Sequence, residues 1–155
     1  MLKKGDKAPN FTANINGDKE ITLNDFNGKK VILYFYPKDN TSGCTKEACE
    51  FRDNLEQLSN QNVVVLGVSP DSVSSHEKFI EKHNLNFDLI SDPENNISES
   101  YFAYGEKSMY GRKYMGIIRS TFLIDENGIV QDSWYKVKVN GHVDAVKKSL
   151  DNLWI

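Results

Sequence analysis

The chain has 155 residues and a formal net charge of −3 at pH 7, which suits one domain with a core of its own. Basic residues are scattered among acidic ones, so no basic stripe supports nucleic acid as a main partner. No segment is apolar over the length of a membrane span, and the first residues lack the apolar core of a signal peptide. We therefore expect a cytoplasmic protein, with no membrane partner, that forms a single domain over residues 1–155.

The first half of the chain alternates predicted strands and helices. Asn16 and Gly17 form a hairpin signal between two short strands. Either Ser72 or Ser74 could cap a helix that ends at His83. In chain order, we expect strands over residues 11–15, 20–23, 30–36, 63–68 and 87–90, and helices over 44–58, from 72 or 74 to 83, and from 93 to about 101.

The second half of the chain is predicted to contain an antiparallel pair of strands and a closing helix. Residues 107–116 are rich in Gly, Tyr and Met and predict a loop, and Asp125–Gly128 predicts a hairpin between strands over 120–124 and 129–139. A helix over 142–154 closes the chain. This order implies an α/β fold with a largely parallel central sheet that is covered on both faces.

Cys44 and Cys49 are the only cysteines of the chain. In a reducing cytosol, two cysteines are more often catalytic or redox-active than a structural disulfide. Cys44 lies where a strand gives way to the first turn of a helix, and the helix dipole and free N–H groups there favour a thiolate. Gly43 allows close approach to the backbone, Thr41 could direct its hydroxyl to the sulfur or to a substrate oxygen, and Pro37 could shield the thiolate from water.

The spacing of the two cysteines restricts how they could react with each other. In an unbroken helix their Cα atoms would lie roughly 8–9 Å apart, whereas a disulfide needs about 4.4–6.8 Å. A bridge between Cys44 and Cys49 would therefore require the segment between them to unwind. Otherwise Cys49 is a small buried residue of the helix.

Other chemistry finds little support in the sequence. A Cys-x4-Cys spacing does not suit a zinc site, and no phosphate-loop or dinucleotide motif is present, so we expect neither a metal nor a cofactor. His76, His83 and His142 are predicted to be surface residues. Arg119 directly precedes a predicted strand, where it is either a surface residue or a cation aimed into a site.

The run from Tyr34 to Asp53 resembles the peroxiredoxins, and within them the bacterioferritin comigratory protein or peroxiredoxin Q subfamily. Further matches over residues 5–11, 67–69 and 116–125 extend the resemblance over nearly the whole chain. Ser42 departs from it, since members usually carry proline there. The resemblance implies a thioredoxin-like fold, with a central mixed sheet flanked by helices on both faces and an N-terminal β-hairpin. It also implies thiol-dependent peroxidase activity without a metal, haem or flavin.

The resemblance also implies roles for single residues. It makes Cys44 the peroxidatic nucleophile, Thr41 the hydroxyl that positions the peroxide, and Arg119 the cation that supports the thiolate and polarises the O–O bond. Cys49 matches the resolving cysteine, which would form an intramolecular disulfide with Cys44. Substrate-binding positions are assigned to Pro37, Gly43 and Glu47.

The implied partners are a peroxide and thioredoxin or a glutaredoxin-like reductant, and the subfamily suggests a monomer. Two alternatives use the same fold: a thiol–disulfide oxidoreductase and a peroxide-sensing redox switch. The absence of a Cys-x-x-Cys motif counts against the first alternative. A slow reaction with peroxide and a stable complex with a partner would favour the second.

Overall fold

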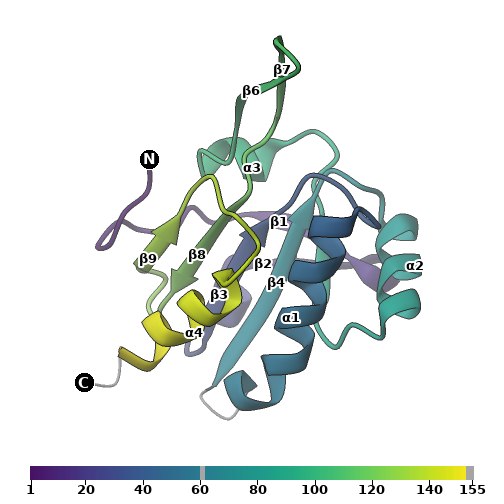
Figure 1. Ribbon diagram of the computed structural model, residues 1–155. Helices are drawn as coiled ribbons and strands as arrows, with labels where there is room; N and C mark the ends of the chain where they lie inside the picture. Colours follow the sequence, from purple (N-terminus) through teal and green to yellow (C-terminus); the bar gives the residue numbers. More distant parts are fainter. Residues whose placement is uncertain (60–61, 153–155) are drawn as a thin grey trace.

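The computed structural model describes residues 1–59 and 62–152 and contains a central seven-stranded sheet, in the order β2-β1-β5-β4-β3-β8-β9 (Figure 1). Its strands are β1 (Thr12–Ile15), β2 (Lys19–Thr22), β3 (Lys30–Phe35), β4 (Val63–Ser69), β5 (Asp88–Ser91), β8 (Ser120–Ile124) and β9 (Val130–Trp134). The helices are α1 (Ser42–Ser59), α2 (Val73–His83), α3 (Asn96–Ser100) and α4 (His142–Asn152), with two 3-10 turns, η1 (Asn16–Asp18) and η2 (Leu23–Phe26). No helix within the described ranges is long and apolar enough to cross a membrane.

The sheet is mixed, as the resemblance implied, and the largely parallel sheet predicted from the order of elements is wrong, because the pairings β1–β2, β1–β5, β3–β8 and β8–β9 are antiparallel. β3, β4 and β5 are parallel neighbours, joined by α1 and α2, whereas β8 runs antiparallel beside β3. All six residues of β3 are buried, because the strand lies in the middle of the sheet and both its faces are covered. An N-terminal hairpin of β1 and β2 joins the same sheet through β5.

Successive residues of β3 divide between two cores, since side chains alternate across a strand. Ile32 and Tyr34, with Tyr36 just after the strand, belong to the core that α1, α2 and α4 cover. Leu33 and Phe35 face the opposite core, which α3 and the N-terminal segment cover. Helices therefore flank both faces, with the three longer ones on a single face.

The segment predicted as a loop over 107–116 is instead most of a hairpin. β6 (Tyr104–Met109) and β7 (Arg112–Ile117) pair antiparallel and project from the rest of the molecule (Figure 1). Tyr110 and Gly111 connect them with φ values of 52° and 79°, the left-handed conformations that a two-residue hairpin turn needs. The prediction was wrong because both faces of this hairpin are largely exposed, so its sequence has no apolar alternation.

Three element boundaries differ from the prediction by two residues or more, and several others differ by one residue. β9 ends at Trp134 rather than at residue 139, and Pro93 lies in the turn before α3 rather than inside a helix. α1 begins at Ser42, two residues earlier than expected, and Ser72 rather than Ser74 caps α2 by accepting a hydrogen bond from the Ser75 N–H. The predicted helix end at residue 154 lies outside the described residues.

Candidate active site

Cys44 lies in the first turn of α1, which follows the carboxyl end of β3 after a loop over residues 36–41. The Thr41 carbonyl accepts the hydrogen bond of the Thr45 N–H at 2.8 Å, so the helical hydrogen bonds begin just before the cysteine. The Cys44 side chain is buried, at 1% exposure. The unsatisfied N–H groups and the dipole of a helix start favour negative charge at this position.

The Arg119 guanidinium bridges Cys44 and Glu47. Its Nη2 lies 3.0 Å from Cys44 Sγ, and its Nη1 donates to Glu47 Oε1 at 2.7 Å. A positively charged donor at this distance stabilises a thiolate. A Cβ added at Gly43 would lie 3.6 Å from the same Nη2, so the guanidinium lies close to the backbone beside the thiol.

The register of the sheet explains how Arg119 reaches a cysteine 75 residues earlier in the chain. Phe35, at the end of β3, pairs with Ser120, at the beginning of antiparallel β8. The residue before β8 and the residues after β3 therefore meet at one edge of the sheet. Of the two possibilities left open by the sequence, a surface residue or a cation aimed into a site, the structure shows the second for Arg119.

Glu47 follows Cys44 by three residues, so the two side chains share one face of α1. Glu47 is fully buried, and its second oxygen, Oε2, has no hydrogen-bond partner among the described residues. Burial raises the pKa of Glu47 to about 7, although the positive charge of Arg119 acts in the opposite direction. Burial alone would lower the pKa of Arg119, but Glu47 and Cys44 outweigh it, and that pKa is raised.

Thr41 and Pro37 lie at the outer side of the site. The Thr41 hydroxyl is exposed and donates to the Lys38 carbonyl at 3.0 Å, so it is not directed at the sulfur. Pro37 and Arg119 line a cleft of about 450 Å³, together with Lys107 of the β6–β7 hairpin. The mispredicted hairpin thus forms part of the entrance to the site.

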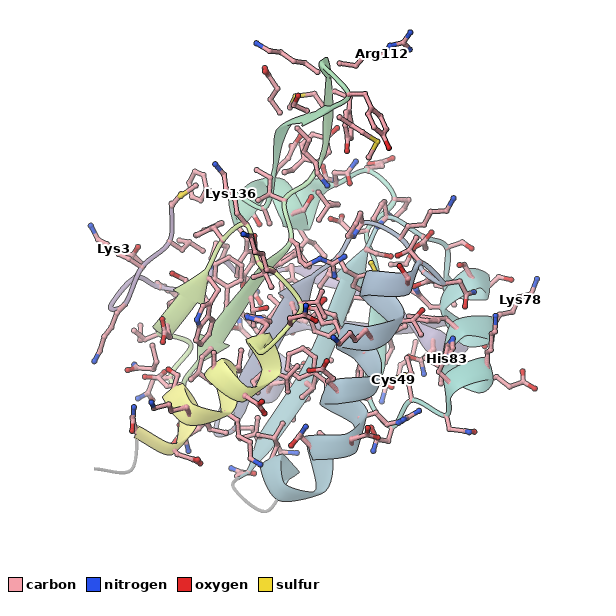
Figure 2. All side chains as sticks on the ribbon, viewed as in Figure 1. Lys3, Cys49, Lys78, His83, Arg112 and Lys136 are labelled. Atoms are coloured by element: carbon pink, nitrogen blue, oxygen red, sulfur yellow. The ribbon has the colours of Figure 1, made fainter. Side chains whose placement is uncertain are left out.

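Cys49 is on the same helix and partly exposed (Figure 2), and both thiols are free. Helical geometry keeps residues at this spacing too far apart to bridge while α1 is intact. The structure therefore shows α1 as a continuous helix in which the two thiols are not joined.

Two histidines predicted on the surface are buried instead. His76 is 0% exposed and hydrogen-bonds Asp39, and His142 accepts or donates a 2.7 Å hydrogen bond with Thr121. Burial, and then the charge of Arg119, lower the pKa of His142 to about 4. Isolated histidines at helical positions carry no sequence signal for burial, since only the packing of α2 and α4 on the sheet encloses them.

The model of the AhpC/TSA family matches residues 4–133. The chain is 54% identical to the putative peroxiredoxin Bcp of Coxiella burnetii, covering 94% of this chain and 96% of that one. It is 46% identical to the peroxiredoxin Bcp of Bacillus subtilis, covering 98% and 97%.

Solved structures give the same result. A cysteine-to-serine mutant of PrxQ from Xylella fastidiosa superposes with a TM-score of 0.94 at 37% identity, covering 100% of this chain and 99% of that chain. The bacterioferritin comigratory protein of Xanthomonas campestris, in a study of its alkyl peroxide reduction activity, has a TM-score of 0.88 at 39% identity, covering 92% and 90%.

A thioredoxin-like fold with a cysteine at a helix start is typical of thiol-dependent oxidoreductases, and the relatives place the chain in that class. More particularly, the chain belongs to the AhpC/TSA family and, within it, to the Bcp/PrxQ peroxiredoxins, which are thiol-dependent peroxidases. The fold and the family expected from the sequence are thereby confirmed.

Proposed function

We propose that the protein reduces hydrogen peroxide and organic hydroperoxides, with Cys44 as the nucleophile. The observation that carries this proposal is the Arg119 guanidinium, which contacts Cys44 Sγ at 3.0 Å while Glu47 holds its other nitrogen. The similar Xanthomonas campestris protein has been studied for alkyl peroxide reduction.

In the first step, the Cys44 thiolate attacks the terminal peroxide oxygen. The S–O bond forms as the O–O bond breaks, so the sulfur becomes a sulfenic acid and the leaving alkoxide or hydroxide takes up a proton. Arg119 stabilises the charge that moves from sulfur to the leaving oxygen. The Thr41 hydroxyl, whose proton is directed to Lys38, has lone pairs free to accept from the peroxide O–H.

Pro37 and Gly43 complete the substrate site in this proposal. Pro37 lines the cleft and screens the thiolate from bulk water. Gly43 has no Cβ beside the guanidinium, so a peroxide can approach the sulfur closely.

In the second step, the start of α1 unwinds and the Cys49 thiol attacks the sulfenic sulfur. A disulfide forms, and the sulfenic oxygen leaves as water after it takes the thiol proton. A dithiol protein of the thioredoxin or glutaredoxin type then supplies two electrons and two protons and restores both thiols. The chemistry requires no metal or cofactor, and we propose that a monomer performs it in the cytoplasm, with residues 1–155 as one domain.

Stopped-flow mixing of the reduced protein with one equivalent of hydrogen peroxide tests the proposal. We expect rapid loss of both thiols and a monomeric product two hydrogens lighter by intact mass. Loss no faster than that of an ordinary cysteine would contradict peroxidase chemistry at Cys44 and would favour the disulfide-exchange or redox-switch alternatives.

Two variants separate the roles of the cysteines. Cys44→Ser should consume no peroxide, and activity that survives would remove Cys44 as the nucleophile. Cys49→Ser should complete one rapid turnover and stop at the sulfenic acid. Undiminished cycling with thioredoxin in Cys49→Ser would show that another group resolves the intermediate.

A further inference from the structure

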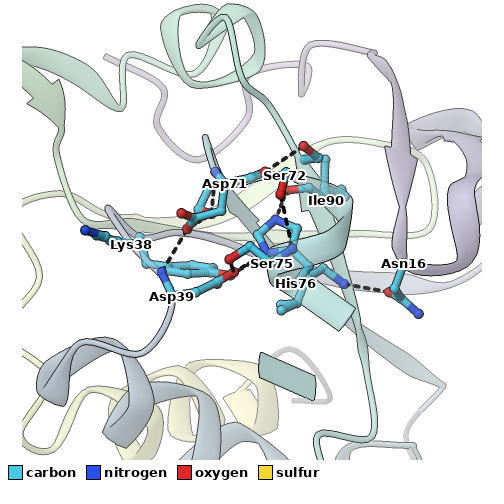
Figure 3. A network of polar contacts seen from close by, with 12 residues as sticks. Asn16, Lys38, Asp39, Asp71, Ser72, Ser75, His76 and Ile90 are labelled. Atoms are coloured by element: carbon cyan, nitrogen blue, oxygen red, sulfur yellow. Dashed lines mark hydrogen bonds and ion pairs between the residues drawn. The ribbon is translucent and has the colours of Figure 1, made fainter. Parts of the chain in front are cut away.

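A buried polar network holds the loop before Cys44 through a single residue, Asp39 (Figure 3). One carboxylate oxygen of Asp39 accepts from the Tyr36 hydroxyl at 2.6 Å. The other accepts from the Ser75 hydroxyl at 2.8 Å and lies 2.7 Å from His76 Nδ1. The Asp39 N–H donates to Asp71 at 2.8 Å. Four hydrogen bonds thus fix this residue, three of them to α2 or to the segment that precedes it.

His76 makes hydrogen bonds through both of its ring nitrogens. His76 Nε2 lies 3.0 Å from the Ile90 carbonyl, which can only accept, so Nε2 carries a hydrogen. His76 Nδ1 lies 2.7 Å from a carboxylate oxygen of Asp39, within hydrogen-bond distance. His76 is 0% exposed and Asp39 is 5% exposed, and both have their buried polar atoms hydrogen-bonded in this network.

The chain after Asp39 is attached to α2 a second time, on the far side of both cysteines. The Arg52 Nη1 donates to the His83 carbonyl at the end of α2, at 2.6 Å. Between the two attachments, the chain turns into α1 at Asn40, which has a left-handed φ of 63°. The part of α1 that carries Cys44 and Cys49 therefore lies between two fixed points on α2, and Figure 1 shows the two helices neighbouring each other on one face.

We propose that Asp39 and His76 form a positioning clamp that sets how readily the first turns of α1 unwind. The inference rests on the proposed function, because only disulfide formation between Cys44 and Cys49 requires the unwinding. With the clamp closed, Cys44 stays against Arg119 and reacts with peroxide. A loosened clamp frees the start of α1, which disfavours that contact and lets the two sulfurs meet.

The two chemical steps should therefore respond in opposite directions when the clamp is weakened. The test compares His76→Asn and Ser75→Ala with two control variants on the same helix: His83→Asn, which keeps the backbone carbonyl that Arg52 contacts, and Ser74→Ala. Ser75 donates to Asp39, whereas Ser74 is an exposed neighbour. Single-turnover mixing with one equivalent of hydrogen peroxide gives the rate constant of sulfenic acid formation and that of disulfide formation, with thermal unfolding used to establish that each variant is folded.

We expect His76→Asn to lower the first rate constant about tenfold, the equivalent of about 1.4 kcal/mol, and to raise the second severalfold. Ser75→Ala should act in the same directions by smaller factors, and it decides the question if His76→Asn does not fold. Both controls should stay within about twofold of the unaltered protein. Rate constants that match the controls, or that both move in one direction, would overturn the clamp.

Amide hydrogen exchange over residues 42–49 of the reduced protein provides a second readout that needs no peroxide. Exchange there should be about tenfold faster in His76→Asn, because local opening limits it. Exchange equal to that of His83→Asn would refute the clamp. If the unaltered protein formed no disulfide while exchange changed as expected, the clamp would stand and the proposed resolving step would fail.

Discussion

Arg119 makes two hydrogen bonds that a single ammonium group could not reproduce with the same geometry. Its planar guanidinium points one nitrogen at Cys44 Sγ and another at Glu47, and a lysine would offer a point charge without that fork. We expect Arg119→Lys to lower the second-order rate constant with hydrogen peroxide by about 10²–10³-fold, the range found when one donor to a developing charge is removed.

Arg112→Lys is the matched control for that experiment, because Arg112 is an exposed residue of the β6–β7 hairpin (Figure 2). Its rate constant should equal that of the unaltered protein. A similar loss of rate in both variants would show that the loss does not depend on the two contacts of the Arg119 guanidinium.

At the scale of elements, β4 and β3 pack closely at Gly67. A Cβ at Gly67 would lie 2.9 Å from Tyr34 Oη and 2.8 Å from the Leu89 side chain, closer than stable contacts allow. The side chains of Tyr34 and Leu89 are fully buried, so neither can move aside to admit a methyl group. We expect Gly67→Ala to lower the free energy of unfolding by about 1–3 kcal/mol, measured by urea denaturation.

Removal of the Tyr34 hydroxyl tests whether it clashes with a Cβ at Gly67. The hydroxyl is buried without a hydrogen-bond partner among the described residues, so Tyr34→Phe alone should be neutral or slightly stabilising. Added to Gly67→Ala, it removes one of the clashing atoms and should recover part of the lost stability. Strictly additive effects of the two changes would contradict this packing.

At the scale of the whole molecule, two buried groups give opposite pH dependences of stability. Glu47 has its pKa raised by burial from 4.5 to about 7, so the folded state binds more protons and stability falls as the pH rises through that interval. His142 has its pKa lowered from 6.5 to about 4, chiefly by burial, so stability rises with pH between those values. The two contributions oppose each other between about pH 4.5 and 6.5.

Replacing either group should leave the pH dependence of stability that is due to the other. In a Cys44→Ser background, Glu47→Gln should make the slope of unfolding free energy against pH more positive, by up to about 1.4 kcal/mol per pH unit. His142→Asn should make the slope more negative by a similar amount. Urea denaturation at pH 4.5, 5.5 and 6.5 measures both, and unchanged slopes would show that neither group titrates differently on folding.

Local signals in the sequence determined much of this fold. Apolar β-branched and aromatic runs predicted the buried strands β3 and β4, and the strand-to-helix transition placed Cys44 in the first turn of α1. These features were predictable because neighbouring residues specify them. The β6–β7 hairpin was not, since its exposed strands bury little surface and leave no period in the sequence.

Only the tertiary structure decided which distant groups surround Cys44. Arg119 reaches the thiol because β8 runs antiparallel to β3 with Phe35 opposite Ser120, a register that no local signal specifies. His76 meets Asp39 because α2 packs on the same face of the sheet as α1. The sequence by itself thus determined the position of Cys44 and the helix that holds it, whereas strand pairing and helix packing decided its charged neighbours, because those contacts join residues that are far apart along the chain.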